Sequence, residues 1–382
     1  MKLATDRLIT QLHLRVESAK AGHDMKYEQF DFESKVLHHQ EHIQRYLDGQ
    51  HPIPLNIEID LTNACNHRCS FCVWATYIGE VRATLPLGIV ISTLDELKAL
   101  GTKSINWTGG GEPVLYKGFY EALDYSYQLG LENGLITNFS LIREEHDDQI
   151  LEQLLWARVS MAGGLREQYR EIQGVDDFDK VIANLKRISE KRRVQQSKLT
   201  LGIAMLVKPG NLHSVPDMVE LASDIGLDYL QLREDMFISP PEKAWWKKQV
   251  IPVFNRAEKR AEEIGLKLLG AKYIDTQEYL NLPSKCHAHH FVLGINAEGY
   301  VAFCKNTRDN PDFYIGDLRK ETFSNIWEES LKKREMESSI NPISCATFCK
   351  NMGINKAIED VVQCNITLPL VDPEPPVHVN FL

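Results

Sequence analysis

Short apolar runs alternate with amphipathic stretches from about residue 55 to residue 235. The runs have the length of strands, and the stretches between them repeat their apolar positions every three to four residues, as helices do. This alternation is typical of βα units built on a parallel sheet. The predicted strands are 55–61, 103–107, 133–137, 157–161, 199–207 and 229–233, and the helices between them include 92–100, 116–129, 177–191 and 212–225.

The segments on either side of this core follow other patterns. At the start, Val36, His39, Ile43 and Leu47 have the spacing of one helix face, which indicates a packed helical cap. After the core comes one long charged helix at 242–265, then a strand hairpin, a helix near 322–333, and a proline-rich tail that either reaches over the active site or straps the surface. We therefore expect a helical extension at 1–50, a core at 51–240, a helical linker at 241–285, a second α+β domain at 286–364 and a tail at 365–382.

Length, charge and hydropathy exclude several classes of protein. The 382 residues suggest two or three domains, and Lys+Arg 43 against Asp+Glu 53 gives a net charge of −10, which argues against a dedicated nucleic-acid binder. The apolar runs fall short of the roughly 20 residues that span a membrane, and the first residues lack the apolar core of a secretory signal. We therefore expect a cytoplasmic protein with neither a membrane nor a nucleic acid as partner.

The eight cysteines lie in two groups. In a reducing compartment, thiols are more often metal ligands or catalytic groups than disulfides. The first group follows the first predicted strand, and the second occupies the last hundred residues. The groups are Cys65, Cys69 and Cys72, and then Cys286, Cys304, Cys345, Cys349 and Cys364. Two separate sites are the natural interpretation.

The first group has the spacing C-x3-C-x2-C. Three thiolates on one short loop can hold three irons of a four-iron cluster, because a fully protein-bound cluster takes four cysteines. The fourth iron is then open to a substrate or cofactor. Zinc is the alternative, and it requires a fourth ligand such as His67.

A glycine-rich motif, NWTGGGEP, follows the second predicted strand. Its glycines, Gly109, Gly110 and Gly111, let the backbone approach a ligand closely, and Glu112 beside exposed backbone groups suits an ammonium group such as the amine of an amino acid. By itself the motif also fits an ordinary glycine turn.

Together the two motifs, in this order of strands, resemble the radical S-adenosylmethionine (SAM) enzymes over roughly residues 51–240. The resemblance implies a partial (β/α)6 barrel similar to a TIM barrel, with a 4Fe-4S cluster on the first three cysteines. It also implies SAM as cofactor and a flavodoxin- or ferredoxin-type electron donor. The cofactor contacts implied for SAM are Phe71 near the adenine, Gly109 to Glu112 at the methionine amine, Ser160 as a polar contact and Arg170 at the methionine carboxylate.

The residues alone also allow other roles for two of these predicted contacts. Ser160 can cap the following helix, and Arg170 can be a solvated helix charge.

The second cysteine group resembles the start of SPASM and Twitch auxiliary-cluster domains. Cys286 and Cys304 flank Gly299 in the pattern C-x12-G-x4-C. The resemblance implies one auxiliary 4Fe-4S cluster, with Cys345 and Cys349 as the preferred remaining ligands and Cys364 spare. Zinc is the alternative here too, either on four of the thiols or on His287, His289 and His290.

The resemblance implies a 5′-deoxyadenosyl radical that removes a hydrogen atom from the substrate. We expect a two-electron dehydrogenation of a small polar substrate of the sugar, aminocyclitol or nucleoside type, with the auxiliary cluster as electron acceptor. Three alternatives remain open. They are a radical epimerase with Cys364 as hydrogen donor, a peptide-modifying maturase and a non-enzymatic iron-sulfur scaffold.

The candidate substrate residues follow the predicted strands. Arg233, Glu234 and Asp235 come at the end of the sixth strand, where one of them can bind hydroxyls or accept a proton. They can equally pair with each other and close the barrel. Weaker candidates are Lys208, Asn211, Trp74 and Tyr77.

Overall fold

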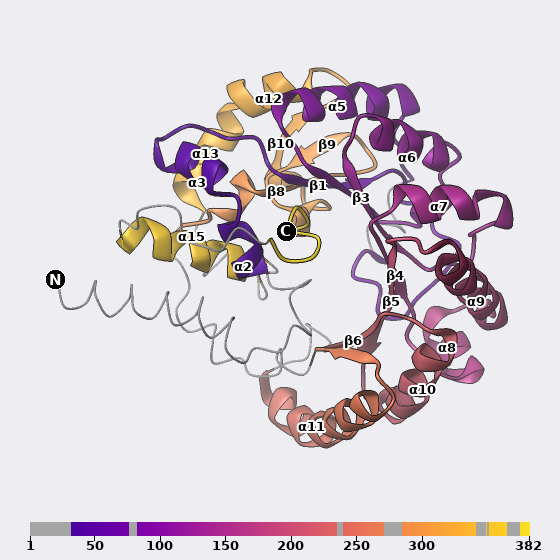
Figure 1. Ribbon diagram of the computed structural model, residues 1–382. Coiled ribbons are helices and arrows are strands. Elements are labelled where there is room, and N and C mark those ends of the chain that lie inside the picture. The colour runs from indigo at the N-terminus through magenta and orange to yellow at the C-terminus, as the bar shows by residue number, and fades with distance from the viewer. Residues whose placement is uncertain are drawn as a thin grey trace.

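One sheet of ten strands organises the part of the chain that the computed structural model describes. That part comprises residues 32–75, 82–234, 240–270, 285–340, 349, 351–364 and 375–382. The strand order is β10-β9-β8-β1-β2-β3-β4-β5-β6-β7. Figure 1 shows the sheet curved into an open barrel with the helices of the core on its outer side.

The six central strands run parallel and confirm the predicted strands to within one residue at each end. A helix follows each of the first five on the outside of the sheet, so the partial (β/α)6 barrel is also confirmed. The strands are β1 Asn56–Asp60, β2 Ser104–Thr108, β3 Glu132–Thr137, β4 Trp156–Ser160, β5 Thr200–Val207 and β6 Tyr229–Glu234. The helices are α5 Leu87–Leu100, α6 Phe119–Gln128, α7 Asp147–Gln153, α8 Arg166–Gln173, α9 Phe178–Gln195 and α10 Val215–Ile225.

Alternation along the strands separates an apolar outer face from a polar inner face. In β1, Ile57 and Ile59 belong to the main core together with Leu94 of α5, whereas Glu58 and Asp60 point to the other face. Both faces of a buried parallel sheet are usually apolar. The polar inner face therefore marks the inside of this barrel as a place where polar groups are needed.

The sheet continues beyond β6, where the sequence predicted a helical linker. Helix α11 (Pro240–Glu263) packs Trp246, Val250 and Phe254 into the main core, and β7 (Lys267–Leu269) pairs in parallel with β6. The described part of this segment is thus one more helix and strand of the barrel wall. No helix within the described ranges, α11 included, is long and apolar enough to cross a membrane.

The C-terminal cysteine region joins the opposite edge of the same sheet. Strand β8 (Val292–Ile295) pairs in parallel with β1, and β9 (Tyr300–Ala302) and β10 (Tyr314–Asp317) continue antiparallel, which confirms the predicted hairpin. The helix predicted near 322–333 is two helices, α12 (Phe323–Glu329) and α13 (Leu331–Ser339). They separate at Ser330, whose side chain caps the second helix by accepting from the amide of Lys333.

A second hydrophobic cluster joins the N-terminal helices to α15 (Met352–Cys364). Helices α2 (Phe32–Leu37) and α3 (Gln40–Leu47) contribute Val36 and Ile43, which pack with Phe291 and Ile358. The predicted single helix face holds only in part, because the chain breaks between the two helices at His39 and Leu47 is exposed. The cap therefore covers the auxiliary side of the molecule.

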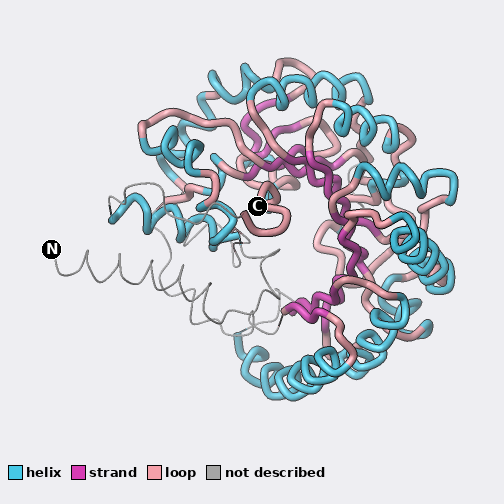
Figure 2. The backbone as a smooth tube through the Cα atoms, viewed as in Figure 1, coloured by secondary structure: helices cyan, strands magenta, loops and turns pink. Residues whose placement is uncertain are grey.

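The end of the chain closes the amino-terminal end of the barrel. Four residues there, each the first of its strand, contact it: Ser104 donates to the carbonyl of Asn380 (2.6 Å), Glu132 accepts from the Asn380 side chain (2.7 Å), Thr200 pairs with His378 (2.9 Å) and Trp156 packs edge-on against Phe381. Figure 2 shows the terminus on the concave side of the arc of strands. The prediction of a tail over the active site or along the surface is therefore wrong for residues 378–382, because His378, Asn380 and Phe381 contact the opposite end of the barrel.

This plug gives a stability prediction. Phe381 is 4% exposed and Val377 is 52% exposed on the same segment. Phe381→Ala should lower the free energy of unfolding by about 3–5 kcal/mol, since it leaves a cavity against Trp156. Val377→Ala should change it by less than about 0.5 kcal/mol. Chemical denaturation of both variants measures the difference, and equal stabilities would contradict the plug.

Candidate functional site

The three cysteines of the first group lie on the loop that leaves the carboxyl end of β1. All three are half-buried, and the amide of Cys72 donates to the carbonyl of Cys69 (3.2 Å). Burial raises the pKa of the Cys65 thiol to about 11 and that of Cys69 to about 12, and the neighbouring thiols add to both shifts. Three thiolates so close together need a cationic partner, which fits the iron of a cluster.

The C-terminal end of α8 holds this loop in place. The amide of Arg68 donates to the carbonyl of Gln173 (3.1 Å), and the amide of Ser70 donates to that of Ile172 (2.9 Å). Gly174 ends the helix at φ +70°, where a Cβ atom would lie 2.5 Å from the carbonyl oxygen of Arg68. Sequence reasoning missed this clamp, although a glycine directly after a helix is a known helix-ending signal.

The zinc alternative at the first site loses its proposed fourth ligand. His67 is buried, with Nε2 3.4 Å from a carboxylate oxygen of Asp177 and Nδ1 3.4 Å from the side-chain nitrogen of Gln173. Burial lowers its pKa, and Asp177 opposes that shift. Both ring nitrogens thus face protein groups.

The glycine-rich loop packs directly on the cysteine loop. The amide of Glu112 donates to the carbonyl of Ala64 (2.9 Å), and a Cβ atom on Gly111 would lie 2.2 Å from that same oxygen. The second of these contacts explains why the motif requires glycine. The two predicted motifs therefore meet at the carboxyl ends of β1 and β2.

Glu112 is held by the protein rather than exposed to a ligand. Its carboxylate accepts from the amide of Val114, the hydroxyl of Thr137 and the amide of Asn138. Burial raises its pKa to about 7, and these hydrogen bonds limit the rise. Glu112 thus ties the loop after β2 to the end of β3, and the contact of Gly109 to Glu112 with the methionine amine stays a prediction.

The other predicted SAM contacts surround the same end of the barrel. Phe71 is half-buried on the cysteine loop, Ser160 is the half-buried last residue of β4, and Arg170 is exposed on α8. The capping alternative for Ser160 is wrong, because the residue at the cap position of α8 is Leu165. The exposure of Arg170 agrees with a solvated charge, so its role stays a prediction.

An arginine from the auxiliary region reaches into the barrel. Arg308 donates from Nε to a carboxylate oxygen of Asp60 (3.0 Å) and from Nη1 to Glu58, and its guanidinium lies 5.0 Å from the centre of the Trp74 ring. Lys305 lies 3.5 Å from the other oxygen of Glu58. Sequence reasoning missed this group, and no spacing pattern marks it.

The charges of this group depend on one another. Burial raises the pKa of Asp60 to about 6, while Arg308 lowers it and Glu58 raises it further. Burial also works against the charge of Arg308, but the two carboxylates raise its pKa above the ordinary value. The backbone of Gly110 also lowers the pKa of Asp60, so the glycine-rich loop acts on this network.

Several inward-facing polar atoms are buried without a hydrogen-bond partner among the described residues. They belong to four strands of the barrel and comprise three acceptors and one donor. The acceptors are Asp60 Oδ1, Asn106 Oδ1 and Gln231 Oε1, and the donor is Arg158 Nε. Unpaired buried polar atoms are costly, so this set is suited to a polar ligand inside the barrel.

The remaining predicted substrate residues divide into two groups. Arg233 is half-buried on the inner face of β6, whereas Asn211 is fully buried and holds the loop after β5 by donating to the carbonyls of Ala162 and Leu206. Asn211 also accepts from the amide of Lys208. Asp235 and Tyr77 lie outside the described residues, and Glu234 is placed only as the last residue of β6.

Three cysteines of the second group gather at the start of α15. Asn351 donates to the sulfur of Cys304 (3.7 Å) and Asn355 donates to the sulfur of Cys349 (3.8 Å). The side-chain oxygen of Asn355 accepts from the amides of His287 (2.7 Å) and Ala288 (2.8 Å), directly after Cys286. Sequence reasoning missed the two asparagines. They come shortly after Cys349 and lie four residues apart, which is the spacing of neighbours on one helix face.

This arrangement fits an auxiliary cluster whose ligands include Cys286, Cys304 and Cys349. Cys345 lies outside the described residues, and only the backbone of Cys364 is placed, at the end of α15. Which cysteine completes the set stays a prediction.

The three histidines of the alternative zinc site do not converge on one point, although His290 lies close to His51 and Glu337. His287 lies between the hydroxyl of Tyr46 and a carboxylate oxygen of Glu359, each 2.6 Å away. His289 points to Glu337 (3.2 Å), and the buried Lys333 ammonium lies 3.2 Å from the same Glu337 oxygen. Glu337 is thus already neutralised, and a divalent ion beside Lys333 would add unpaired buried charge.

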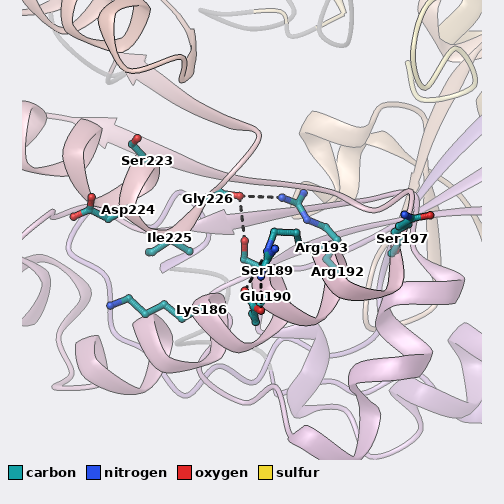
Figure 3. Close-up of a pocket in the computed structure, with 11 residues that line it drawn as sticks. Lys186, Ser189, Glu190, Arg192, Arg193, Ser197, Ser223, Asp224, Ile225 and Gly226 are labelled. Atoms are coloured by element: carbon teal, nitrogen blue, oxygen red, sulfur yellow. Dashed lines mark hydrogen bonds and ion pairs between the residues drawn. The ribbon is translucent and has the colours of Figure 1, made fainter.

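A surface hollow between the ends of α9 and α10 lies away from this chemistry. Figure 3 shows that its polar groups brace the two helix ends, since Ser189 and Arg192 donate to the carbonyl of Gly226 (3.1 and 2.9 Å) and Arg193 pairs with Glu190. We interpret it as a structural contact.

Two family models match the chain in the regions just described. The model of the radical SAM superfamily matches residues 59–222, and that of the SPASM iron-sulfur cluster-binding domain matches residues 286–351. The chain belongs to the radical SAM superfamily. The cofactors that these two models imply are SAM, a 4Fe-4S cluster and an auxiliary iron-sulfur cluster.

Relatives of this radical SAM enzyme act on different kinds of substrate. A dTDP-4-amino-4,6-dideoxy-D-glucose ammonia-lyase of Streptomyces venezuelae is 28% identical over 185 residues, 45% of this chain and 38% of the relative. A PqqA peptide cyclase of Bradyrhizobium diazoefficiens is 24% identical over 47% of this chain and 46% of the relative. A PqqA peptide cyclase of Xanthomonas campestris is 22% identical over 72% of this chain and 74% of the relative. The chain thus spans less than half the length of the first two.

Solved structures share the fold. The crystal structure of Streptococcus suis SuiB bound to precursor peptide SuiA aligns with a TM-score of 0.61 at 16% identity, over 82% of this chain and 74% of that one. Native anSMEcpe with bound AdoMet aligns with a TM-score of 0.56 at 17% identity, over 79% of this chain and 88% of that one. At these identities the likeness concerns the fold alone.

The contact of Gly111 with the cysteine loop gives a prediction for SAM binding. Gly111→Ala should abolish SAM binding and lower the iron content, because its Cβ atom would overlap the carbonyl of Ala64. Gly88→Ala, in α5 with open space around its Cβ position, should leave both unchanged. Iron analysis and calorimetric SAM titration test this, and normal SAM affinity in Gly111→Ala would contradict the close packing of the two loops.

The buried network around Arg308 gives a pH-dependent prediction. Arg308→Met should lower the free energy of unfolding by about 3–5 kcal/mol near neutral pH, because two buried carboxylates lose their cation. The pKa of Asp60 should then rise further above about 6, while its unfolded value stays near 3.8. The folded variant therefore binds the proton more tightly than the folded wild type, and its deficit should shrink as pH falls through the variant's raised pKa toward about 6, below which Asp60 is protonated in both.

Denaturation at several pH values measures this deficit. The variant Arg308→Met with Asp60→Asn should be more stable than Arg308→Met alone, since one unpaired charge is gone. A deficit that does not change with pH would contradict the pairing.

Proposed function

We propose that this enzyme dehydrogenates a small polyhydroxylated substrate, such as a sugar, aminocyclitol or nucleoside, in a two-electron oxidation. The observation that carries the proposal is the set of buried, unpaired polar atoms on the inner face of the barrel. Hydroxyl groups both donate and accept, so a polyol that reaches the inner strands can satisfy three acceptors and one donor.

The chain's own residues then have distinct tasks. When bound, SAM and the two clusters supply the radical that removes one hydrogen atom and the acceptor that takes one electron, and one proton leaves to a base. Cys65, Cys69 and Cys72 hold the first cluster. Arg233, Glu234 and Asp235 at the end of β6 are the proposed groups that bind hydroxyls or take the proton, and a flavodoxin- or ferredoxin-type protein is the proposed reductant.

A small substrate is favoured over a peptide by two features. The tail closes the amino-terminal end of the barrel, and the Arg308 group with its carboxylates occupies the interior beside β1. Several relatives are named for peptide substrates, so peptide modification is the competing outcome of the test. The sugar lyase among the relatives supports the small-molecule class.

The epimerase alternative assigns the hydrogen donor to Cys364. Its helix, α15, buries Ile354, Ile358 and Val361 in the second hydrophobic cluster, on the side of α2. A residue at the end of this helix is therefore a less favourable donor than one on an inner strand, which supports dehydrogenation.

Two cysteine variants test the proposal. With dithionite as reductant, Cys69→Ser should lose all cleavage of SAM to 5′-deoxyadenosine. Cys304→Ser should retain single-turnover cleavage but lose dehydrogenated product. Iron and sulfide analysis should give about eight irons per wild-type chain, as two four-iron clusters require. Zinc analysis on the same samples serves as the control for the metal assignment.

The substrate class is tested with a panel of aminocyclitols, nucleoside diphosphate sugars, nucleosides and synthetic peptides, followed by mass spectrometry. A product two mass units lighter from a small polyol supports the proposal. Full turnover by folded Cys304→Ser, or a product only from a peptide, would overturn it.

A further inference from the structure

Two buried side-chain amides, one beside each cluster site, turn opposite ends toward a cysteine sulfur. Gln173, at the end of α8, is fully buried and places its oxygen 3.8 Å from the sulfur of Cys69. Asn355, in α15, is 1% exposed and places its nitrogen 3.8 Å from the sulfur of Cys349. The oxygen carries a partial negative charge and the nitrogen carries partial positive hydrogens.

The orientation of Asn355 is set by its backbone partners. Its oxygen accepts from two amides, those of His287 and Ala288, at 2.7 and 2.8 Å. Turning the amide over would place the NH2 group against two N–H donors, so the nitrogen must face Cys349.

The orientation of Gln173 is set in the opposite sense. Its nitrogen donates to the carbonyl of Ser160 (3.2 Å) and lies 3.4 Å from Nδ1 of His67. Turning this amide over would bring two oxygens together at Ser160. A cysteine that binds iron loses its thiol proton, so with the cluster bound the Gln173 oxygen would face a thiolate.

We propose that these two amides set the clusters at different reduction potentials, with Gln173 lowering that of the SAM-binding cluster and Asn355 raising that of the auxiliary cluster. Hydrogen bonds to cluster sulfurs stabilise the reduced, more negative state, and a facing oxygen destabilises it. Asn351 adds a second donor at Cys304 (3.7 Å). This difference in reduction potential keeps the first cluster a strong electron donor to SAM and makes the auxiliary cluster an electron acceptor. The need for such an acceptor rests on the proposed dehydrogenation.

Redox titration of the reconstituted full chain, followed by EPR without substrate, tests the proposal. Asn355→Leu should lower the midpoint potential of the auxiliary cluster, corresponding to about a tenfold change in its reduction equilibrium, or about 59 mV for one electron. Gln173→Met should raise that of the first cluster by a similar factor. SAM addition identifies the first cluster, because only its EPR signal should change.

Asn351→Leu separates this role from a merely structural one. Among the described residues the Asn351 side chain hydrogen-bonds only to the sulfur of Cys304, and leucine adds no charge, so a structural role predicts the wild-type potential and our proposal predicts a lower one. Matched controls on the same helices are Gln363→Leu in α15, which is exposed and bonded to Glu359, and Gln168→Met in α8. Neither should shift a potential.

The two proposals fail separately. Unchanged potentials in fully loaded Asn355→Leu, Asn351→Leu and Gln173→Met would overturn the role of the amides, whatever the substrate is. Shifted potentials together with an epimerised product would support the amides and overturn the dehydrogenation.

Discussion

A single buried guanidinium joins the auxiliary domain to the catalytic barrel. Arg308 follows the predicted auxiliary ligand Cys304 by four residues, and its partners Glu58 and Asp60 lie on the strand that leads into the first cysteine loop. Burying three charges costs several kcal/mol per ion, and the cost is offset only by close, hydrogen-bonded pairing. The orientation of β8 beside β1 is therefore fixed by charge as well as by strand pairing, and the two cluster sites inherit their relative position from it.

The two ends of the barrel are specialised in opposite ways. At the amino end, the first residues of β2, β3, β4 and β5 bind the chain's own tail, and the rings of Trp156 and Phe381 fill the space. At the carboxyl end, loops carry the cysteines and the glycine-rich motif. Because protein closes the amino end, the carboxyl end is the side where cofactor and substrate can bind. The plug also limits the water that can reach a radical from the amino end of the barrel.

Local patterns could be predicted from the sequence, whereas contacts between distant segments could not. The periodicity of the central strands and the spacing of the two motifs are readable within about fifteen residues. The interpretation of 241–285 as a linker arose because the long charged face of α11 masks the apolar stripe of Trp246 and Phe254 in the sequence pattern. Arg308 pairs with residues 248 and 250 positions away, and the tail bonds to residues 178 to 276 positions earlier. In the sequence Asn355 is recognisable only as a helix residue, because its contact with the sulfur of Cys349 depends on the fold.

The charges inside the barrel narrow the kind of molecule that suits it. Glu58 and Asp60 are balanced by Arg308 and Lys305, all of them buried or nearly so. Arg158 on β4 and Arg233 on β6 add two further cations to the inner face. Since buried charge must be paired, a negatively charged group of the substrate is better accommodated beside these two strands than beside β1, where the carboxylates already have their cations.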